Sequence, residues 1–252
     1  DYVLPVLIDM HVHMPPDNAL KLTPYFLLLH LAHGVTSIRE AGDVDGTGTP
    51  AARGEIESGR YPGPRMFTTG EFVGAGEARW PNTVLMEDAS EAEAIVAELK
   101  AAGHTWVKSY DGLPIDCVRA LQTAARAAGM GVMGHVPADL AYEEALIPDV
   151  QHFTGVPAPR AVEDAGNTMR LGAWLRVDDA RMDEIVAATI ANGLVNTPTL
   201  VSLERLGMYE RYGEAKNDAA LALLPAFYVD VIWHPTEGIP AYRDLPADFF
   251  EF

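Results

Sequence analysis

Short apolar segments alternate with segments of helical periodicity along most of this chain of 252 residues. The apolar segments read as β-strands that are covered on both faces. They are VLPVLIDMHVH, VTSIREAG, RMFTTGEF, HTWVKSY, MGVMGHV, PDVQHFTGV and GLVNTPTLVSL. Strand and helix in regular alternation predict a parallel sheet with helical crossovers.

The helical segments are expected between those strands. They are Thr23–His33, Ser90–Ala101, Ile115–Ala128, Leu140–Leu146 and Asp179–Asn192. Gly34 and Gly193 directly follow two of them, at the position where glycine commonly ends a helix. Ser90 followed by Glu93 indicates a capping box at the start of another.

Seven strand segments are one fewer than a closed eight-stranded barrel requires. After Ser202 the sequence predicts helices and then a proline-rich tail that ends at Phe252, with no clear eighth strand. No linker or low-complexity tract divides the chain. We therefore predict one α/β domain over residues 1–252, a (β/α)8 TIM-type barrel of which about seven βα units are visible.

Charge and composition restrict the kinds of partner. Lys and Arg total 18 against 36 Asp and Glu, a formal net charge of −18. Such a surface repels nucleic acid and anionic lipid, and no segment approaches the roughly 18–20 apolar residues that span a bilayer. The single cysteine, Cys117, excludes an internal disulfide and suits the cytoplasm, and no basic, apolar leader precedes Tyr2. We expect a soluble protein that acts on a small molecule, with a homo-oligomer as one possible state.

Two histidines end the first predicted strand. Residues i and i+2 share a face of a strand, so His11 and His13 point the same way. In a barrel that face is the interior, and the C-terminal ends of the strands form the catalytic rim. Two imidazoles there would form half of a metal site. The pair alone is a weak motif, because it also arises by chance.

Three further residues, Lys108, His135 and His152, end later strands in the same way. A lysine at the inner end of an apolar strand is unfavourable unless it is neutralised or paired. Each histidine alone could be a core residue with satisfied hydrogen bonds. Five such residues at one rim are hard to explain by packing, and together they indicate a site for one or two divalent metal ions.

The strand motifs resemble those of the metal-dependent amidohydrolase superfamily. The opening VLPVLIDMHVHM is similar to the superfamily's first strand, where a Pro-Gly-Leu-Ile-Asp-x-His-x-His run is typical. Similar motifs follow in order, namely GVTSIREAG, WVKSY, GHV, QHF and NTPTLVSLERL. They cover essentially the whole chain and resemble most the imidazolonepropionase-like and Xaa-Pro dipeptidase-like branch.

The resemblance implies a binuclear zinc centre and a hydrolytic reaction. By it, His11 and His13 hold the more buried ion, and His135 and His152 hold the second. Lys108, carboxylated by carbon dioxide, bridges the two ions. The implied reaction is cleavage of a carbon–nitrogen (amide) bond in a small acyl amino acid, dipeptide or cyclic amide by metal-activated water.

The chain departs from the family pattern in several places. In the family an Asp at the end of strand eight completes the first metal site, and a β-sandwich flanks the barrel. Neither is visible here, so we expect them from residues after Phe252 and before Asp1; Asp230, in the run FYVDVIW, reads as helical and is not assigned the role. Where relatives carry a Gly-Gly-His-Gly loop, residues 74–77 read GAGE, so substrate specificity is not transferred.

Several alternatives stay open. Tyr110, two residues beyond Lys108, either donates to substrate or packs at the rim with its hydroxyl in water. Fold and ligands do not separate an amidohydrolase from a lactonase or phosphotriesterase, and a non-catalytic metal-binding barrel fragment is a further reading. The remaining histidines are expected outside the site: His30, His33, His104 and His234.

Overall fold

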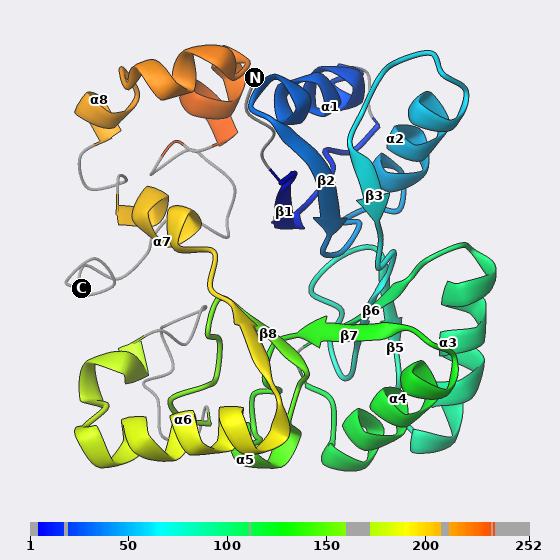
Figure 1. Cartoon of the computed structure of the whole chain (residues 1–252), viewed down its shortest axis with the longest axis vertical. Coiled ribbons are helices and arrows are strands. Elements are labelled where there is room, and N and C mark those ends of the chain that lie inside the picture. Colours follow the sequence, from blue (N-terminus) through cyan, green and yellow to red (C-terminus); the bar gives the residue numbers. More distant parts are fainter. Residues whose placement is uncertain are drawn as a thin grey trace.

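The computed structural model describes residues 5–17, 20–110, 112–159, 172–207, 212–232 and 234. Within them, parallel strands form the interior and helices pack around it (Figure 1). The strands are β1 (Leu7–Val12), β2 (Val35–Glu40), β3 (Arg65–Phe67), β4 (Phe72–Gly74), β5 (Thr83–Leu85), β6 (Trp106–Ser109), β7 (Gly131–Gly134), β8 (Asp149–Gln151) and β9 (Val195–Thr197). The α-helices are α1 (Thr23–Ala32), α2 (Gly48–Glu57), α3 (Ala92–Ala101), α4 (Ile115–Ala127), α5 (Tyr142–Ala145), α6 (Asp179–Asn192), α7 (Leu200–Gly207) and α8 (Tyr212–Ala215).

The strands form two parallel sheets that one chain segment joins. The orders are β1-β2-β3 and β5-β4-β6-β7-β8-β9. Residues 65–74 enter both sheets, because β3 pairs with β2 while β4 pairs with β6. Apart from β5, which branches from β4, the strands follow one another in chain order as in a TIM-type barrel. Among the described residues no strand closes the gap between β9 and β1.

The parallel α/β fold is confirmed, but the observed strands are shorter than the predicted segments, and two of these segments are interrupted for a clear local reason. The third one divides at residues 68–71, where Gly70 has a φ of +71°. The last one ends at Thr197 because Pro198 has no N–H for the ladder and Thr199 has a left-handed φ of +50°. Helix α7 follows directly. The short strand β5, which pairs with β4, was not predicted.

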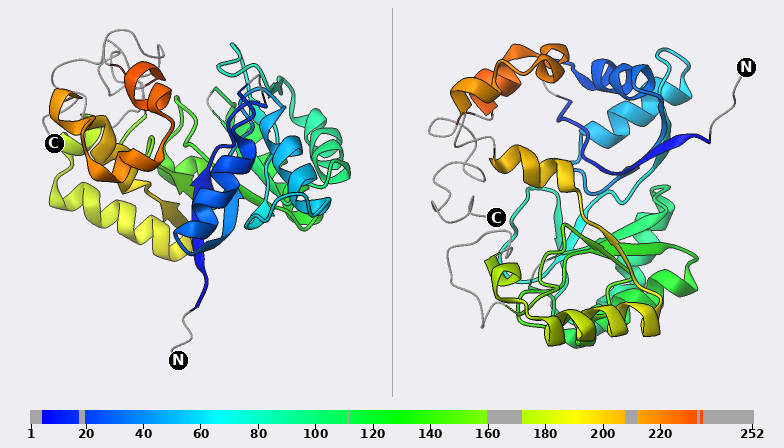
Figure 2. Two further views of the ribbon diagram at one scale, coloured as in Figure 1. Left: turned by 90° about the horizontal axis from the view of Figure 1, so that it is seen from above. Right: turned by 60° about the vertical axis from the view of Figure 1, so that its left-hand side comes forward.

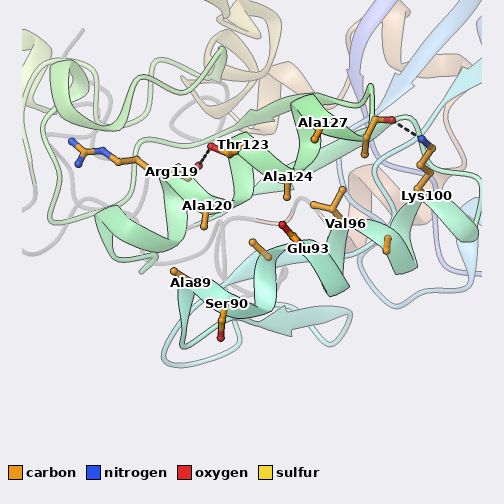
Figure 3. A pocket seen from close by; sticks show the side chains of 13 residues that line it. Ala89, Ser90, Glu93, Val96, Lys100, Arg119, Ala120, Thr123, Ala124 and Ala127 are labelled. Atoms are coloured by element: carbon orange, nitrogen blue, oxygen red, sulfur yellow. Dashed lines mark hydrogen bonds between the residues drawn. The ribbon is translucent and has the colours of Figure 1, made fainter.

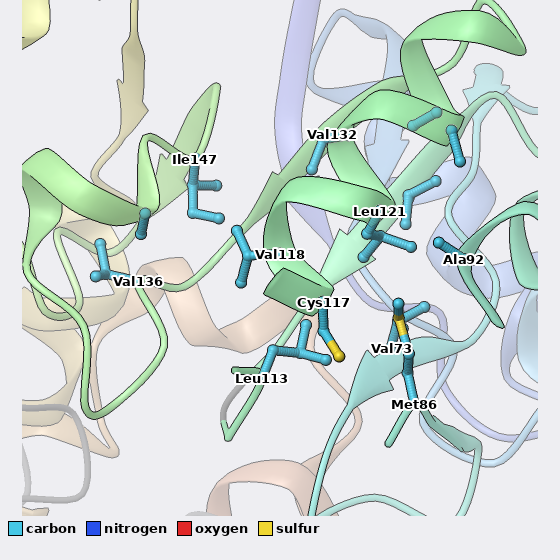
Figure 4. Close-up of a cluster of buried hydrophobic side chains, with 14 of the residues drawn as sticks. Val73, Met86, Ala92, Leu113, Cys117, Val118, Leu121, Val132, Val136 and Ile147 are labelled. Atoms are coloured by element: carbon cyan, nitrogen blue, oxygen red, sulfur yellow. The ribbon is translucent and has the colours of Figure 1, made fainter. Parts of the chain in front are cut away.

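The main hydrophobic core lies between the sheet and helices α3 and α4 (Figure 4). Helix α4 places apolar residues at i, i+1, i+4, i+7 and i+8, so one face of it is apolar. These residues are Cys117, Val118, Leu121, Ala124 and Ala125. Burial of a side chain the size of Leu121 contributes roughly 1.5–3 kcal/mol. Cys117 is buried there, as predicted for a small core residue.

Local side-chain chemistry sets the helix ends. Gly34 and Gly193 have φ values of +77° and +60°, which confirms them as the left-handed residues after two helices. The predicted capping box at Ser90 is wrong. Asp88 is the cap, because its carboxylate accepts from the backbone N–H of Ser90 at 2.8 Å and from its hydroxyl at 2.6 Å. A 3-10 turn, Ala89–Glu91, then leads into α3.

Residues 212–232 pack against α1 (Figure 2). The hydroxyl of Tyr25 donates to the carbonyl oxygen of Leu223. The ring centroids of Phe26 and Tyr228 lie 5.4 Å apart. This late segment therefore covers the outside of the first helix rather than extending the sheet.

Asp230 belongs to the late segment and lies in a π-helical turn, Tyr228–Ile232. The residue is exposed. Its place in this turn confirms the helical interpretation of FYVDVIW. Of the helices that the described residues form, none is both long and apolar enough to cross a membrane.

Candidate metal centre

Four histidines from three strands meet at the carboxyl ends of the parallel strands. His11 lies in β1 and His13 directly follows it, while His135 and His152 directly follow β7 and β8. The ring centroid of His11 lies 5.0 Å from that of His13 and 4.5 Å from that of His152. The centroids of His135 and His152 are 5.4 Å apart. The rings therefore form one contiguous cluster.

Lys108 joins this cluster from β6. Its side chain is buried, and its Nζ lies 5.9 Å from the ring centroid of Tyr110. Together with burial, its positive charge lowers the pKa values of His11, His13 and His152, so it faces the same interior space. The structure thus brings together the five residues that the strand ends predict.

His11 and His13 are each held through the Nδ1 atom. Nδ1 of His13 lies 2.7 Å from the carbonyl oxygen of Gly42, which can only accept, so Nδ1 carries the proton. Nδ1 of His11 lies 2.6 Å from Oε1 of Gln151, which is also an acceptor. With the proton on Nδ1, Nε2 of each ring carries a lone pair, the form of imidazole that binds metal ions.

The two Nε2 atoms of His11 and His13 lie 3.1 Å apart. Neither has a proton to donate to the other, so two lone pairs face each other, and this contact is repulsive unless a cation lies between them. Zn–N bonds of roughly 2.0–2.1 Å at a tetrahedral angle place two ligand nitrogens roughly 3.3 Å apart. The pair therefore fits two ligands of one metal ion.

Removal from bulk water keeps these imidazoles neutral. Burial lowers the pKa of His152 to about 2, and neighbouring positive charges add to the effect. Crowding of its ring by protein atoms also lowers the pKa of His13 to about 4, although the residue is exposed at the rim. Burial holds the pKa of His11 well below its usual value. At pH 7 all three are in the neutral form that ligates metals.

The backbone at His152 is strained. His152 and Phe153 have left-handed φ values of +59° and +57°, which cost of order 1–3 kcal/mol each outside glycine. The N–H of His152 donates to the carbonyl oxygen of Thr197 at 3.0 Å, and its Nδ1 lies 2.5 Å from the hydroxyl of Thr199. Such strain persists where neighbours fix it, and it gathers at functional sites.

Only the His11–His13 pair has the spacing expected of two ligands of one metal ion. Within the described ranges, no three His, Cys, Asp or Glu side chains already surround a common point as metal ligands do. The neutral imidazoles suit a divalent ion such as zinc, whereas the buried lysine fits beside such an ion only without its positive charge.

A buried polar network that was not predicted from the sequence lies beneath the histidines. Gln151 is fully buried, and Arg39 forms an ion pair with Asp149 in which both side chains are buried. The available signal was the i, i+2 spacing of Asp149 and Gln151 in an otherwise apolar strand, which places both on its inner face.

Aromatic side chains form one wall of the cluster. The ring centroid of Tyr110 lies 4.6 Å from that of His135 and 5.1 Å from that of Phe72. Nε1 of Trp80 donates to the hydroxyl of Tyr110 at 3.1 Å. Tyr110 therefore faces the histidines and is bonded to protein at its hydroxyl. Trp80 lies in the loop after β4 and was not predicted.

Glu40 supports the loop that anchors His13. Its buried carboxylate accepts from the backbone N–H groups of Gly42, Thr69 and Gly70. Burial raises the pKa of Glu40 to about 7, against the effect of these hydrogen bonds. The same Gly42 accepts from His13 through its carbonyl, so Glu40 fixes the position of that acceptor.

A separate groove of about 580 Å³ lies between α3 and α4 on the outside of the sheet (Figure 3). Small side chains such as Ala120 and Ala124 line it, with Lys100 and Arg119 at its edges. No histidine lines it, so it is distinct from the candidate metal centre.

The other histidines of the sequence analysis make local contacts elsewhere. His30 lies on α1 and His33 directly follows it, and Nδ1 of each lies 2.8 Å from the carbonyl oxygen four residues earlier. Nδ1 of His104 lies 2.8 Å from the hydroxyl of Thr68, before β6. His234 stacks edge-on against Tyr212 in the late segment.

Parallel strands that carry histidines and a lysine at their carboxyl ends define a TIM-type barrel with its site at the catalytic rim. Residues 2–210 match the Amidohydrolase family, and the chain belongs to that family. A search of curated protein sequences finds no match to it.

Solved structures show the same fold. An amidohydrolase matches with a TM-score of 0.58 and 19% identity, over 89% of this chain and 60% of that one. A protein described as a prolidase from Bifidobacterium longum matches with a TM-score of 0.51 and 19% identity, over 90% of this chain and 68% of that one. Bottromycin amidohydrolase matches with a TM-score of 0.55 and 22% identity, over 87% of this chain and 49% of that one. This chain thus spans about half to two thirds of these proteins. The predicted superfamily and barrel fold are confirmed.

Proposed function

We propose that this barrel carries the metal centre of a hydrolase that cleaves carbon–nitrogen bonds. The observation that carries the proposal is the pair of lone pairs on His11 and His13, whose Nε2 atoms lie 3.1 Å apart. Membership of the Amidohydrolase family supports the reaction class. Because the chain spans only part of its structural relatives, the activity is proposed for the protein as a whole.

In this proposal the cluster holds two divalent ions, with zinc as the preferred metal. His11 and His13 would hold one ion, and His135 and His152 would hold the other. Lys108, as a carbamate, would supply an anionic oxygen donor to both, because carboxylation removes the charge of a buried cation. When bound, such ions supply Lewis acidity toward a carbonyl and lower the pKa of a water molecule.

The proposed substrate is a small acyl amino acid, dipeptide or cyclic amide. The aromatic wall of Phe72, Trp80 and Tyr110 would hold its apolar part beside the histidines. We assign the hydroxyl of Tyr110 as a donor to the substrate. Trp80 can only donate to that hydroxyl, so Trp80 orients its oxygen.

Metal analysis tests the centre. After reconstitution with zinc, the protein should retain one to two equivalents by elemental analysis, and His11→Ala or His13→Ala should lose at least one. Lys108→Ala should lose the second ion, and added bicarbonate or acetate should restore part of it. His33→Ala is the matched control, because His33 directly follows α1 and its Nδ1 bonds to a carbonyl oxygen of that helix. A wild-type protein without retained zinc would refute the centre.

Substrate assays test the reaction. N-acyl amino acids, dipeptides and cyclic amides should be hydrolysed by the zinc-loaded wild type and His33→Ala, and not by His11→Ala. Lactones and phosphotriesters are the comparison panel, since the same ligands serve those reactions. Turnover confined to that panel would replace the amide assignment.

A further inference from the structure

A buried ion pair lies beneath the histidines and has no part in the function proposed above. Nη2 of Arg39 lies 2.6 Å from Oδ2 of Asp149, with the two side chains 2% and 3% exposed. Nε of Arg39 donates to the carbonyl oxygen of Met10 at 2.9 Å, directly before His11 in β1. The guanidinium carbon lies 4.5 Å from the centre of the Trp106 ring. The pair is therefore held between four strands, just below one end of the metal centre.

Two acceptors of Asp149, its carboxylate and its backbone carbonyl, decide which way the amide of Gln151 faces, and the carboxylate makes the shorter contact. Nε2 of Gln151 lies 2.9 Å from Oδ1 of Asp149 and 3.2 Å from its carbonyl oxygen. Both atoms only accept hydrogen bonds, so the NH2 group must face them and Oε1 must face His11. Nδ1 of His11, 2.6 Å from that oxygen, must then carry the ring proton.

The carboxylate itself has little freedom to turn. Arg39 holds Oδ2, and the hydroxyl of Thr197 lies 2.9 Å from Oδ1 and 3.2 Å from Oδ2. The same hydroxyl accepts from Nη2 of Arg39 at 3.2 Å. Each oxygen of Asp149 thus has a fixed partner. Arg39 orients the carboxylate of Asp149, and that carboxylate orients the amide of Gln151.

We propose that Arg39 and Asp149 are positioning residues that fix the tautomer of His11 through Gln151. The effect on metal affinity rests on the proposed function, whereas the tautomer itself does not. A purely structural ion pair would stabilise the barrel and leave the ring proton of His11 unchanged. His13, which bonds to the backbone carbonyl of Gly42, is the internal control because no side chain sets its tautomer.

Asp149→Asn should move the proton of His11. The oxygen of the new amide stays with Arg39, so its NH2 group takes the place of Oδ1 and faces Gln151. Gln151 then turns its oxygen toward that NH2 group, gives up its longer hydrogen bond of 3.2 Å to the carbonyl oxygen of residue 149, and presents its own NH2 group to His11. Nδ1 of His11 must now accept, so the proton moves to Nε2 and removes the lone pair. Zinc affinity should fall about 10–100-fold, as is usual when a group that orients a metal ligand is lost.

A second substitution should reverse this effect. In Asp149→Asn with Gln151→Glu, the amide and the carboxylate exchange places and the net charge is unchanged. The carboxylate at position 151 accepts from the new amide and from Nδ1 of His11, which restores the Nδ1–H tautomer. Arg39 lacks its carboxylate partner in this double variant as in the single one, so a structural role alone predicts no rescue.

Imidazole ¹⁵N NMR spectra of metal-free protein report the tautomer, and competition with a chromophoric chelator reports zinc affinity. We expect His11 as Nδ1–H in the wild type and the double variant, and as Nε2–H in Asp149→Asn. His13 should stay Nδ1–H throughout. Gln151→Met keeps the Arg39–Asp149 ion pair and is the second test variant if Asp149→Asn does not fold. It should give mixed tautomers of His11 and weaker zinc binding.

The proposal is overturned if His11 stays Nδ1–H with unchanged zinc affinity in Asp149→Asn or Gln151→Met. It is also overturned if the double variant folds and fails to restore the tautomer. A wild type that shows the Nδ1–H form and binds no zinc would refute the metal centre and leave the positioning role intact.

Discussion

The acceptors that hold the three anchored histidines differ in kind, and this difference sets how easily each ring is disturbed. His13 bonds to a backbone carbonyl, which no side-chain substitution removes. His11 depends on the amide of Gln151, which can turn over. His152 depends on the hydroxyl of Thr199, which can donate or accept. The lone pair of His13 is therefore the most robust of the three.

Replacement of Lys108 should change the titration of its histidine neighbours. In metal-free Lys108→Met, the pKa of His13 should rise from its value of about 4, because a positive charge that disfavours the imidazolium is removed. An NMR titration of ring ¹³C signals would measure this. Lys100→Met is the control, since Lys100 bonds to the carbonyl oxygen of Ala128 on the outer helices. A fall in the pKa would instead mean that Lys108 is anionic without metal.

For single residues, the sequence predicts the candidate metal ligands better than the residues that hydrogen-bond to them. Strand alternation placed His11 and His13 on one inner face, and the structure agrees. It did not identify Gln151 as the partner of His11, because the two residues are 140 positions apart. Spacing along a strand states which face a side chain occupies, but not which side chain meets it across the barrel.

At the level of elements, glycine allows β6 and β7 to approach closely beside the site. Gly134 pairs with Ser109, and a Cβ at Gly134 would lie 1.9 Å from the carbonyl oxygen of Ser109. The same oxygen accepts from the N–H of His135 at 3.2 Å. Any side chain at position 134 therefore separates the two strands and displaces His135.

Gly134→Ala should lower the free energy of unfolding by about 1–3 kcal/mol or more, as other overpacked interiors do. Urea unfolding of the metal-free protein would measure it. Gly54→Ala is the matched control, because Gly54 is exposed in α2 and a Cβ there meets nothing within 4 Å. That variant should gain about 0.5–1 kcal/mol from helix propensity. Equal effects of the two substitutions would contradict the close approach of β6 and β7.

The division of the third predicted strand also has a tertiary cause. The N–H groups of Thr69 and Gly70 donate to the carboxylate of Glu40, which occupies groups that a continuous strand would use in its ladder. No local pattern in RMFTTGEF reveals that contact. The seventh predicted strand, by contrast, ran past its observed end although a local signal was present, because Pro198 has no N–H for the ladder.

For the molecule as a whole, the alternation of strand and helix was sufficient to predict the barrel, but the described residues do not close it. The gap lies between β1 and β9. Large apolar side chains at these edges are more than half exposed, namely Val6, Leu7 and Val195. Such edges favour pairing with a further strand. A strand eight with its Asp remains a prediction.

Hydrogen exchange should report the open edges. Amides of β1 and β9 should exchange faster than those of β6 and β7, which have a paired strand on each side. Mass spectrometry of this chain would measure all four strands in one experiment, so β6 and β7 are the internal reference. Equal protection of β1 and β9 would show that another segment pairs with them in solution.

The pairing of His11 with Gln151 also has a consequence during synthesis. A ribosome releases His11 and His13 well before Gln151, which follows His11 by 140 residues. At roughly 5–20 residues per second, the nascent chain carries the two imidazoles for on the order of ten seconds without this anchor. In that interval a zinc ion meets only a flexible pair of rings, whose protons can sit on either nitrogen. For the proposed metal centre, the order of translation therefore predicts tight binding only after folding, once β8 has reached β1.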